Sequence, residues 1–490
     1  MNVLFVSSEC YPLAKTGGLA DVVGALPLAL AAQGVEARVL LPRYPGTLEL
    51  LHDTAVVARL PRRFGGEGTL IVGTTDDGLR VVLVDLPHLF DRPGGLYVDG
   101  AGRDWADNDL RFGALSWVAA AIATGEIDIG WRADVVHLHD WQAALTAAYL
   151  HYGTRPAPPS LLTIHNLAFQ GVFDASSCAA LDLPPAAMGD DGIEFWGRLS
   201  FLKAGVKWCT HLSTVSPTYA QEILTVANGM GFDGLLRERS SSLTGIVNGI
   251  DTTVWNPAAD AFLVAPYVRY STRRLDAKAA NKAALQAELG LHVAPEVPLF
   301  CVVSRLTSQK GIDLLVEAIP HVLWRGAQFA VLGTGERELE DAVRRLAEAH
   351  PGQVVTRIGY DEALSHRLQA GADAIVVPSR FEPCGLTQLY GLRYGTLPVV
   401  ARVGGLADTV IDANEAAMKD GVATGFQFTP VDTEQLGLAL GRACDLFWDP
   451  PAWRRVQKRA MGRDVGWDAA AAKYMALYER IVTASPRAAQ

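Results

Sequence analysis

Short apolar segments alternate with longer helical patterns along this chain, and no other feature of the sequence constrains its fold as strongly. Each apolar segment is rich in β-branched residues and ends in a polar or Gly-rich turn, which is typical of a buried strand. The predicted strands of the first half are Val3–Ser7, Ala37–Leu41, Val81–Asp85, Val135–His137 and Ser160–Ile164. Ala- and Leu-rich segments such as Asp21–Gln33 and Trp141–Tyr152 predict helices between them. Strand–helix alternation predicts a parallel sheet covered by helices.

The same alternation starts again in the second half. Strands are predicted at Leu299–Val303, Gln328–Leu332, Val354–Ile358, Ala374–Val377 and Leu397–Ala401, with helices at Gly311–Trp324 and Glu336–Ala349. We therefore expect two α/β halves that meet near Ile246–Pro257, followed by a C-terminal helix over Trp467–Ile481. The predicted divisions are residues 1–245, 246–465 and 466–490.

Size and composition exclude several classes of protein. A chain of 490 residues is too long for a single hydrophobic core, and 49% hydrophobic with 20% charged residues indicates a folded chain. A net charge of -10 argues against nonspecific nucleic-acid binding, although a locally basic cleft for a small anion is compatible with it. The most apolar stretch, Ala114–Thr124, is shorter than the ~20 residues that a membrane span needs, so no membrane partner is expected.

The N-terminus and the cysteines indicate the compartment. No basic residue precedes Lys15, so the n-region of a signal peptide is missing. The cysteines are scattered and include no CxxC pair, which predicts neither a disulfide framework nor a zinc site. They are Cys10, Cys178, Cys209, Cys301, Cys384 and Cys444. We expect a cytoplasmic protein.

Cationic, Gly-containing loops follow the first predicted strand of each half. Lys15-Thr16-Gly17-Gly18 leads into a helix whose N-terminus presents free N–H groups to an anion. In the second half, Arg305 and Lys310 of the segment Ser304–Gly311 can converge on a diphosphate, the first as a fork and the second as a point charge. Open α/β sheets bind ligands at the carboxyl ends of their strands, where both loops lie. The alternative for each loop is an ordinary turn with surface cations.

Polar residues also follow two later strands of the first half. In His137-Leu138-His139-Asp140-Trp141, two His and an Asp suggest a metal, but no further ligand is near in the sequence. Trp141 fits either stacking on a sugar or packing in the core. In Thr163–Asn166, His165 fits either a contact to a reacting hydroxyl or a structural role.

In the second half, Pro378–Leu386 joins a strand to a helix that is expected to begin near Leu386. Its N-terminal N–H groups suit a phosphate, and Glu382 can hold sugar hydroxyls, cap the helix or form a surface ion pair. Cys384 is expected to be a packed thiol and not a nucleophile. Gly333-Thr334-Gly335 is a candidate loop for phosphate or ribose, or a tight turn.

The segment Gly229–Gly234 matches the pattern GxGxxG of dinucleotide-binding proteins. That pattern requires a buried strand before it, whereas Tyr219–Asn228 is predicted to be more helical than extended. An NAD-dependent dehydrogenase is therefore disfavoured.

Several of these motifs occur together in one family. They are Lys15–Asp21, His137–Trp141, Thr163–Asn166, Val247–Asp251, Ser304–Gly311, Glu382–Thr387 and Gly404–Val410. On these residues the sequence resembles the bacterial-type glycogen (starch) synthases, which are retaining glycosyltransferases that use ADP-glucose. The resemblance extends from Val3 to about Tyr478. Related nucleotide-sugar transferases carry a second glutamate eight positions after the first, and Tyr390 at that position favours the glycogen-synthase branch.

The resemblance implies an α/β fold of the GT-B type, in which two facing Rossmann-like domains enclose an interdomain cleft and the C-terminal helix returns to the first domain. It implies transfer of glucose from ADP-glucose to the nonreducing end of an α-1,4-glucan such as glycogen, with retained anomeric configuration and without a metal or cofactor. UDP-glucose as donor, or a small sugar as acceptor, is the alternative, and a noncatalytic glucan-binding protein is a further one. The oligomeric state is not indicated.

Motif position implies a role for each candidate residue. The catalytic set would be His165, Arg305, Lys310 and Glu382. The substrate-binding set would be Lys15, Gly18, Asp21, Tyr97, Asp140, Trp141, Asn166, Asn248, Gly333, Tyr360, Cys384, Gly385, Leu386 and Thr387. Among these, Tyr360 resembles the residue that stacks on adenine, and Tyr97 and Trp141 resemble acceptor or sugar contacts.

These roles predict a mechanism. Arg305 and Lys310 would stabilise the negative charge that grows on the departing diphosphate, in place of a divalent ion. Glu382 would position the sugar and would not act as the nucleophile of a double displacement. The acceptor would attack from the leaving-group face and give its proton to the departing phosphate.

Overall fold

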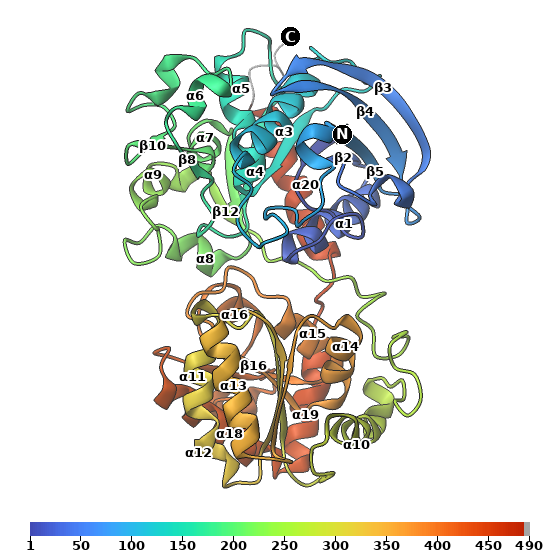
Figure 1. Cartoon of the computed structure of the whole chain (residues 1–490). Coiled ribbons are helices and arrows are strands. Elements are labelled where there is room, and N and C mark those ends of the chain that lie inside the picture. The colour runs from blue at the N-terminus through green and yellow to red at the C-terminus, as the bar shows by residue number, and fades with distance from the viewer. Residues whose placement is uncertain (485–490) are drawn as a thin grey trace. The chain divides into compact units, whose positions relative to one another are not determined.

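The computed structural model describes residues 1–484, and the chain forms two compact units (Figure 1). Unit 1 comprises Met1–Asn248 together with the segment from Trp467 onward. Unit 2 comprises Gly249–Gly466. Each unit has its own central sheet and its own hydrophobic core.

Within the described residues, the main sheet of unit 1 has nine strands in the order β12-β11-β7-β6-β1-β2-β5-β4-β3. The strands from β12 to β5 pair in parallel, and Val3 of β1 lies opposite Ala37 on one side and Val135 on the other. The parallel strands are β1 (Asn2–Val6), β2 (Glu36–Pro42), β5 (Arg80–Asp85), β6 (Val135–His139), β7 (Ser160–Ile164), β11 (His211–Thr214) and β12 (Leu243–Gly245). The strands predicted from the sequence for this half are confirmed as β1, β2, β5, β6 and β7.

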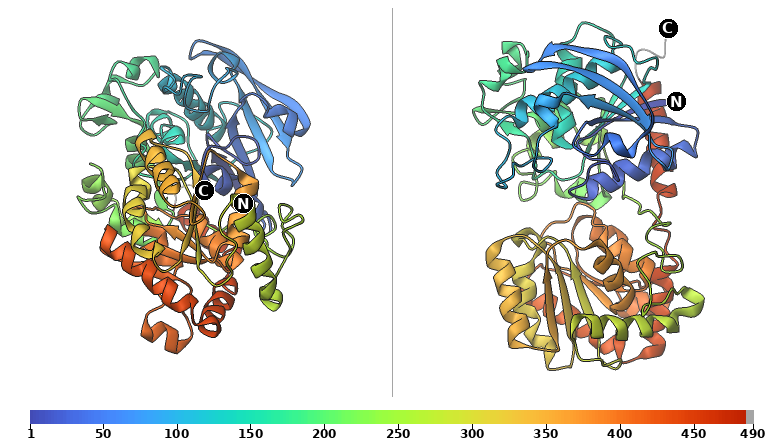
Figure 2. Two further views of the ribbon diagram at one scale, coloured as in Figure 1. Left: turned by 60° about the horizontal axis from the view of Figure 1, so that its bottom comes forward. Right: turned by 45° about the vertical axis from the view of Figure 1, so that its right-hand side comes forward.

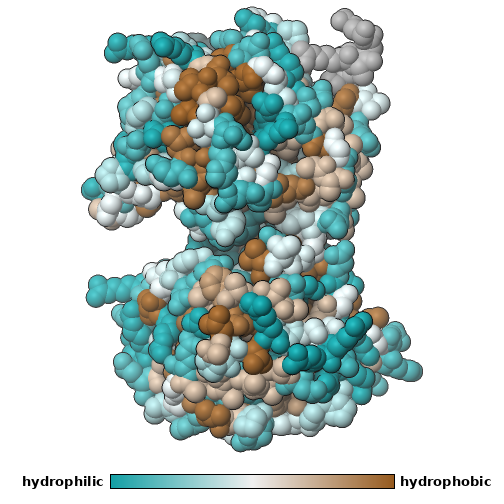
Figure 3. Space-filling model, turned by 90° about the vertical axis from the view of Figure 1, so that its right-hand side faces the viewer, coloured by the Kyte–Doolittle hydropathy of each residue, from teal (hydrophilic) through white to brown (hydrophobic). Residues whose placement is uncertain are grey.

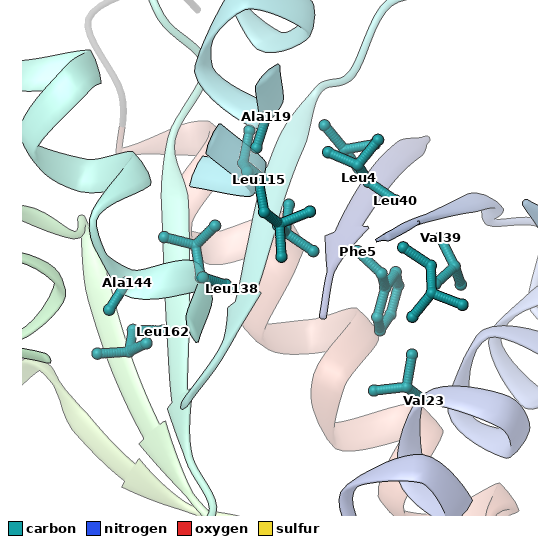
Figure 4. Close-up of a cluster of buried hydrophobic side chains, with 14 of the residues drawn as sticks. Leu4, Phe5, Val23, Val39, Leu40, Leu115, Ala119, Leu138, Ala144 and Leu162 are labelled. Atoms are coloured by element: carbon teal, nitrogen blue, oxygen red, sulfur yellow. The ribbon is translucent and has the colours of Figure 1, made fainter. Parts of the chain in front are cut away.

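Helices pack on both faces of this sheet. Figure 4 shows Leu4 of β1 on the side of Leu115, from α3 (Asn108–Ala123), and Phe5 on the side of Val23, from α1 (Gly18–Ala31). Successive side chains of a strand point to opposite faces, so β1 is apolar throughout because both of its faces are covered. The predicted helix Trp141–Tyr152 is present as α4 (Asp140–Ala144) and α5 (Thr146–Tyr152).

An antiparallel ribbon, which the sequence did not predict, extends the sheet of unit 1. It consists of β3 (His52–Arg63) and β4 (Gly66–Thr74), and the pairing of the two strands contains three register shifts. Figure 3 shows apolar side chains gathered on the face of unit 1 that carries this ribbon. β3 is the edge strand of the sheet, and its register shifts and the exposed Arg59 and Arg62 disfavour pairing of this edge with other chains.

A small sheet and a C-terminal helix complete unit 1. The small sheet pairs β8 (Val172–Phe173), β10 (Arg198–Ser200) and β9 (Glu194–Phe195) in that order. The helix α20 (Asp468–Thr483) buries Tyr474 and Tyr478 in the core of unit 1, and Figure 1 shows it in red among the elements of that unit.

Unit 2 contains a parallel sheet of six strands, counted over residues 249–466, in the order β15-β14-β13-β16-β17-β18. Figure 2 shows helices on both faces of this sheet. The strands are β13 (Leu299–Val303), β14 (Gln328–Gly333), β15 (Val354–Ile358), β16 (Ala374–Val377), β17 (Leu397–Ala401) and β18 (Phe426–Phe428). All but β18 match the strands predicted for the second half.

The helices of unit 2 differ in one place from the prediction. The expected single helix Gly311–Trp324 is wrong, because it is divided into α11 (Ile312–Ala318) and α12 (Pro320–Leu323). Pro320 causes the division, since a proline has no N–H to donate within a helix. The other helices that bear on the site are α13 (Arg337–Ala349), α14 (Glu362–Gly371) and α15 (Thr387–Tyr394).

Over residues 1–484, no helix combines the length and the apolar character that crossing a bilayer requires. All six cysteines are buried.

Candidate functional site

Glu9 organises the loop after β1 in unit 1. Its carboxylate accepts hydrogen bonds from the backbone N–H of Thr16 at 2.7 Å and of Gly17 at 3.1 Å, and from the hydroxyl of Tyr97 at 2.6 Å. The Tyr97 hydroxyl lies 2.8 Å from Ser8 as well. Burial and the neighbouring Glu9 raise the pKa of Tyr97, so its hydroxyl stays protonated. The sequence did not single out Glu9, although its place just after the first strand could have identified it.

Lys15 lies on the rim of this loop. Its Nζ is 2.8 Å from the Oδ1 of Asp21, and the two side chains are each 28% exposed. The ammonium also lies 5.3 Å from the centre of the Tyr11 ring. Gly17 is the N-cap of α1, and a Cβ built on it would meet no atom within 4 Å. The predicted donor residues Lys15, Gly18 and Asp21 therefore border open space at the start of a helix.

Histidines cluster where β6 and β7 end. His137 is buried, and its ring nitrogens lie 2.8 Å from the Tyr478 hydroxyl and 2.6 Å from the Thr163 hydroxyl, which indicates a structural role. His139 Nδ1 lies 2.9 Å from His165 Nε2. Burial lowers the pKa of His165 to about 3 and that of His139 well below its usual value, so both rings are neutral near pH 7. No group of at least three His, Cys, Asp or Glu side chains in the described chain is arranged to hold a metal ion.

Asp140 holds the turn that presents His165 and Asn166. Its Oδ1 accepts the backbone N–H of His165 at 2.7 Å and that of Asn166 at 3.4 Å, and its own φ is +56°. Burial raises the pKa of Asp140 to about 7, against the lowering effect of these bonds. The geometry favours action through the turn over a direct contact of Asp140 with substrate.

Trp141 combines the two roles that the sequence left open. Its ring packs edge-on against Phe112 at 5.0 Å and tilted against Phe173 at 5.6 Å, yet the residue is only partly buried. One part of the indole therefore belongs to the core and another part faces outward.

In unit 2, the central feature is an ion pair between two loops that are far apart in the sequence. Lys310 Nζ lies 2.5 Å from Glu382 Oε2, with side-chain exposures of 18% and 8%. The hydroxyl of Ser379 donates to the same carboxylate oxygen at 2.9 Å. Ser379 was not singled out from the sequence. The lysine predicted to bind a diphosphate thus neutralises, in this structure, the glutamate predicted to bind the sugar.

Arg305 occupies the exposed end of the same loop. Its Nη2 lies 3.4 Å from the side-chain oxygen of Gln309. Gly311, which closes the loop, has φ +67°, and a Cβ there would lie 2.1 Å from the carbonyl oxygen of Pro378. This position requires glycine, and the close approach brings the Arg305–Lys310 loop against the Pro378–Leu386 loop.

The Glu382 loop is fixed through its backbone. Gly404 has φ +41°, and a Cβ on it would lie 2.0 Å from the Glu382 carbonyl, which accepts the N–H of Gly405 at 3.1 Å. The amide of Gln388 donates to the carbonyls of Cys384 and Gly385 at 3.0 and 2.9 Å. Cys384 is buried, as expected for a packed side chain. Leu386 is the N-cap of α15 and Thr387 its first residue.

The remaining substrate-binding candidates, Gly333, Tyr360 and Asn248, have distinct environments. Gly333 ends β14 and passes so close to the Ser304 carbonyl that a Cβ would lie 1.9 Å from it. Tyr360 follows β15 with a largely exposed ring, and its hydroxyl is bonded to Glu362. Asn248 is buried, and among residues 1–484 its Oδ1 finds no hydrogen-bond partner. A buried acceptor of this kind suits a ligand hydroxyl.

Apart from Asn248, which follows β12 at the end of the first segment of unit 1, the candidate residues form two sets, one in each unit. The set of unit 1 surrounds the carboxyl ends of β1, β6 and β7, and that of unit 2 surrounds the ends of β13, β14, β15 and β16. In both units, these strand ends are where open α/β sheets bind ligands. The cations suit an anionic ligand in either set, and the neutral imidazoles and amides suit hydroxyl groups.

Models of two families match the chain. The starch synthase catalytic domain matches residues 2–238, and the glycosyl transferases group 1 match residues 297–445. The glycogen synthase of Roseobacter denitrificans is 52% identical over 98% of this chain and 100% of its own length. That of Jannaschia sp. is 55% identical over 98% of both chains.

Two solved structures are also similar to this chain over nearly its whole length. The catalytic domain of starch synthase IV from Arabidopsis thaliana, bound to ADP and acarbose, superposes with a TM-score of 0.89 at 32% identity, over 98% of this chain and 99% of its own. Sucrose-phosphate synthase from Thermosynechococcus elongatus, at 19% identity and a TM-score of 0.60 over 99% of this chain and 100% of its own, shares the fold. The predicted fold class is confirmed: the two Rossmann-like units form a GT-B glycosyltransferase. The chain belongs to the glycogen synthase family, and it is a glycosyltransferase.

Proposed function

We propose that this enzyme transfers glucose from ADP-glucose to the nonreducing end of an α-1,4-glucan and retains the anomeric configuration. A solved relative at 32% identity is bound to ADP and to acarbose, which supports a nucleotide-linked donor and a glucan acceptor. The curated relatives that share about half of this sequence are named glycogen synthases.

The Lys310–Glu382 ion pair is the observation on which this proposal depends most. Breaking the bond between the sugar and the diphosphate leaves negative charge on the leaving group, and a preformed, partly buried cation stabilises that charge where it develops. Arg305 lies on the same loop with an exposed guanidinium and offers a second, bidentate donor. When the diphosphate binds, Lys310 can divide its hydrogen bonds between the phosphate and Glu382.

Glu382 acts as a positioning group in this proposal. Its Oε2 already accepts from Lys310 and Ser379, and its backbone carbonyl is fixed by Gly405. A carboxylate neutralised in this way is a weak nucleophile but a good acceptor for sugar hydroxyls. Retention then requires attack from the leaving-group face, and the departing phosphate takes the proton of the acceptor hydroxyl.

Unit 1 supplies acceptor contacts and further groups for sugar hydroxyls. By motif position the neutral His165 holds a hydroxyl of the donor glucose, Asn166 can hold a sugar hydroxyl, and the turn that carries both residues is fixed by Asp140. Tyr97 and the outward part of Trp141 offer a hydroxyl and a ring face to the acceptor. Lys15, two residues before the N-cap of α1, is the donor contact that we propose for this unit. We place the enzyme in the cytoplasm because its buried, scattered cysteines fit a reducing compartment.

A donor comparison tests this proposal. Purified enzyme receives glycogen and either ADP-glucose or UDP-glucose, each labelled in the sugar, and incorporation into polymer is measured. We expect faster incorporation from ADP-glucose, and the new linkages should be cleaved by an α-1,4-specific hydrolase. Preference for UDP-glucose, or a product resistant to that hydrolase, would refute the assignment. The Lys310→Ala variant controls for incorporation by contaminating enzymes.

A further inference from the structure

Exposed apolar side chains of unit 1 gather beside its small sheet. They are Trp196, Phe169 and Met230, and Trp196 is 81% exposed. The amide of Gln170, next to Phe169, donates to the Met230 carbonyl at 3.0 Å. A Cβ on Gly231 would lie 3.5 Å from the Trp196 indole nitrogen, so the three residues adjoin one another. Figure 1 shows the elements that surround them, β8, β10 and α9 (Asp233–Glu238), together at one edge of unit 1.

Trp196 occupies a turn position that disfavours it. β9 and β10 pair through Phe195 and Arg198, which leaves the two-residue turn Trp196-Gly197 with φ of +54° and +77°. Turns with two positive φ angles strongly prefer Asn, Asp or Gly first, and a bulky residue there costs roughly 1 kcal/mol. The exposed indole gains little packing to offset this cost. A residue that breaks a local rule without a packing gain indicates a function.

Met230 repeats this situation on the neighbouring loop. It too has positive φ, at +48°, and it is exposed. It belongs to the segment Gly229–Gly234, whose GxGxxG pattern follows α8 (Pro217–Glu222) and a turn, and therefore lacks the strand that a dinucleotide site requires. This loop instead packs against the hairpin formed by β9 and β10, because Phe232 stacks on Phe195 with ring centres 4.7 Å apart.

The exposed residues are continuous with the acceptor residues of unit 1. Phe173 of β8 packs against Trp141 at 5.6 Å, and β8 pairs with β10 of the hairpin. On the other side, the N–H of Phe169 donates to the Asn166 carbonyl at 3.2 Å. Trp141 and Asn166 are therefore linked to Trp196 and Met230 through intermediate residues: Trp141 through Phe173 and the β8–β10 pairing, and Asn166 through Phe169 and Gln170.

We propose that Trp196, Met230 and Phe169 form a platform that binds an α-1,4-glucan chain at glucose units away from the reacting end. The proposal rests on the proposed function, because it assumes a polymeric acceptor whose chain passes over the neighbouring surface of unit 1. A glucose unit has an apolar C–H face and a rim of hydroxyls. An exposed indole matches both, with its ring face and with its N–H donor. Exposed apolar patches rimmed by polar residues mark binding surfaces of this kind.

The test measures acceptor dependence in Trp196→Ala and Trp196→Asn. Loss of one stacking contact should raise the half-saturating glycogen concentration about tenfold. The KM for ADP-glucose should stay within twofold, and the loss with maltotriose should be smaller than the loss with glycogen, because a trisaccharide covers less of the surface around Trp196 than a long glucan chain does. The Asn variant is decisive: it suits the turn better than Trp, so a loss that persists in it comes from the missing ring and not from misfolding.

Trp324→Ala provides the matched control, because Trp324 is 76% exposed and belongs to unit 2. It should leave all these quantities unchanged. If the wild type elongates glycogen from ADP-glucose but both Trp196 variants keep its glycogen dependence, the platform is refuted and the proposed function stands. An equal loss with maltotriose and with glycogen also refutes the platform.

Gel electrophoresis in the presence of glycogen and without donor separates the two proposals. Retardation of the wild type and of Trp324→Ala, with faster migration of Trp196→Asn, supports the platform whatever donor the enzyme uses. Equal migration of all three overturns it. Failure of the wild type to incorporate glucose from ADP-glucose would count against the proposed function alone.

Discussion

Lys15 of unit 1 and Lys310 of unit 2 occupy corresponding places, each in a Gly-containing loop after the first strand of its sheet, but their environments differ. The pair of Lys15 with Asp21 lies at the surface, with both side chains 28% exposed. The pair of Lys310 with Glu382 is largely buried, and Ser379 bonds to its carboxylate. A similar sequence pattern can therefore supply either an adaptable surface cation or a preorganised one. An exposed pair contributes little and exchanges easily, whereas a buried cation is already in place when charge develops.

Lys310→Ala tests the preorganised cation and should have the largest effect. We expect turnover at saturating ADP-glucose to fall by roughly 10²–10³, because stabilisation of the leaving group is lost in the transition state. Single-turnover kinetics measure this directly. Thermal unfolding of the variant controls for damage to the Glu382 loop. Near wild-type turnover in a folded variant would remove Lys310 from the chemistry.

Lys15→Ala removes an exposed cation and should reduce turnover less than Lys310→Ala does. We expect the KM for ADP-glucose to rise by about tenfold while turnover changes less, because a contact present in both ground and transition states affects binding. Steady-state kinetics of both lysine variants under one set of conditions give the comparison. A drop in turnover as large as that of Lys310→Ala would show that the two lysines are equivalent.

The two units also differ in how they hold a buried carboxylate, and Asp140→Asn tests this difference. Asp140 bonds to backbone N–H groups, whereas Glu382 has a lysine. Because burial raises the pKa of Asp140 to about 7, the folded state holds its proton more tightly than the unfolded state. Its contribution to stability is therefore complete below the unfolded pKa near 4 and is lost as the pH rises to about 7. Asn cannot ionise, so its contribution does not change with pH.

Melting temperatures between pH 5 and pH 8 measure this effect. The wild type should lose stability relative to Asp140→Asn by a few degrees as the pH rises, since about 1 kcal/mol shifts a domain of this size by 2–4 °C. Parallel curves for the two proteins would contradict the assignment of a raised pKa to Asp140.

Removal of divalent ions should have the smallest effect. If the protein cations stabilise the leaving group without a metal, incubation with EDTA should leave incorporation within twofold of the untreated enzyme. The same assay after addition of Mg²⁺ provides the control. Strong inhibition by EDTA that Mg²⁺ reverses would show that Arg305 and Lys310 do not suffice.

Most parallel strands of both sheets could be predicted because they are covered on both faces and form uninterrupted apolar runs, as in Leu299–Val303. The short parallel strands β11, β12 and β18 were not predicted. The β3–β4 ribbon could not, because β3 is mostly exposed and its register shifts interrupt any alternation of polar and apolar residues. The division of Gly311–Trp324 at Pro320 could have been anticipated from the proline alone.

For the candidate site, glycines and cations at strand ends indicated the correct loops, since local chemistry sets them apart. The partners within the site were not predictable. Lys310 and Glu382 are 72 residues apart in the chain, and no local pattern indicates that they form an ion pair. Glu9 and Ser379 lie beside the loops that the sequence indicated, and the position of Glu9 just after the first strand could have identified it, but the hydrogen bonds of both residues form only in the folded loops.

The helix α20 has a consequence for biosynthesis. Unit 1 needs Tyr474 and Tyr478 to fill its core, and the Tyr478 hydroxyl bonds to His137. The ribosome makes these tyrosines after the whole of unit 2. Most of unit 1 therefore leaves the exit tunnel first, but unit 1 is complete only after the last segment has been made. Unit 2 can fold before α20 is available to unit 1. A nascent chain halted after Gly466 would expose the apolar surface that α20 covers, which would make it a natural client for chaperones.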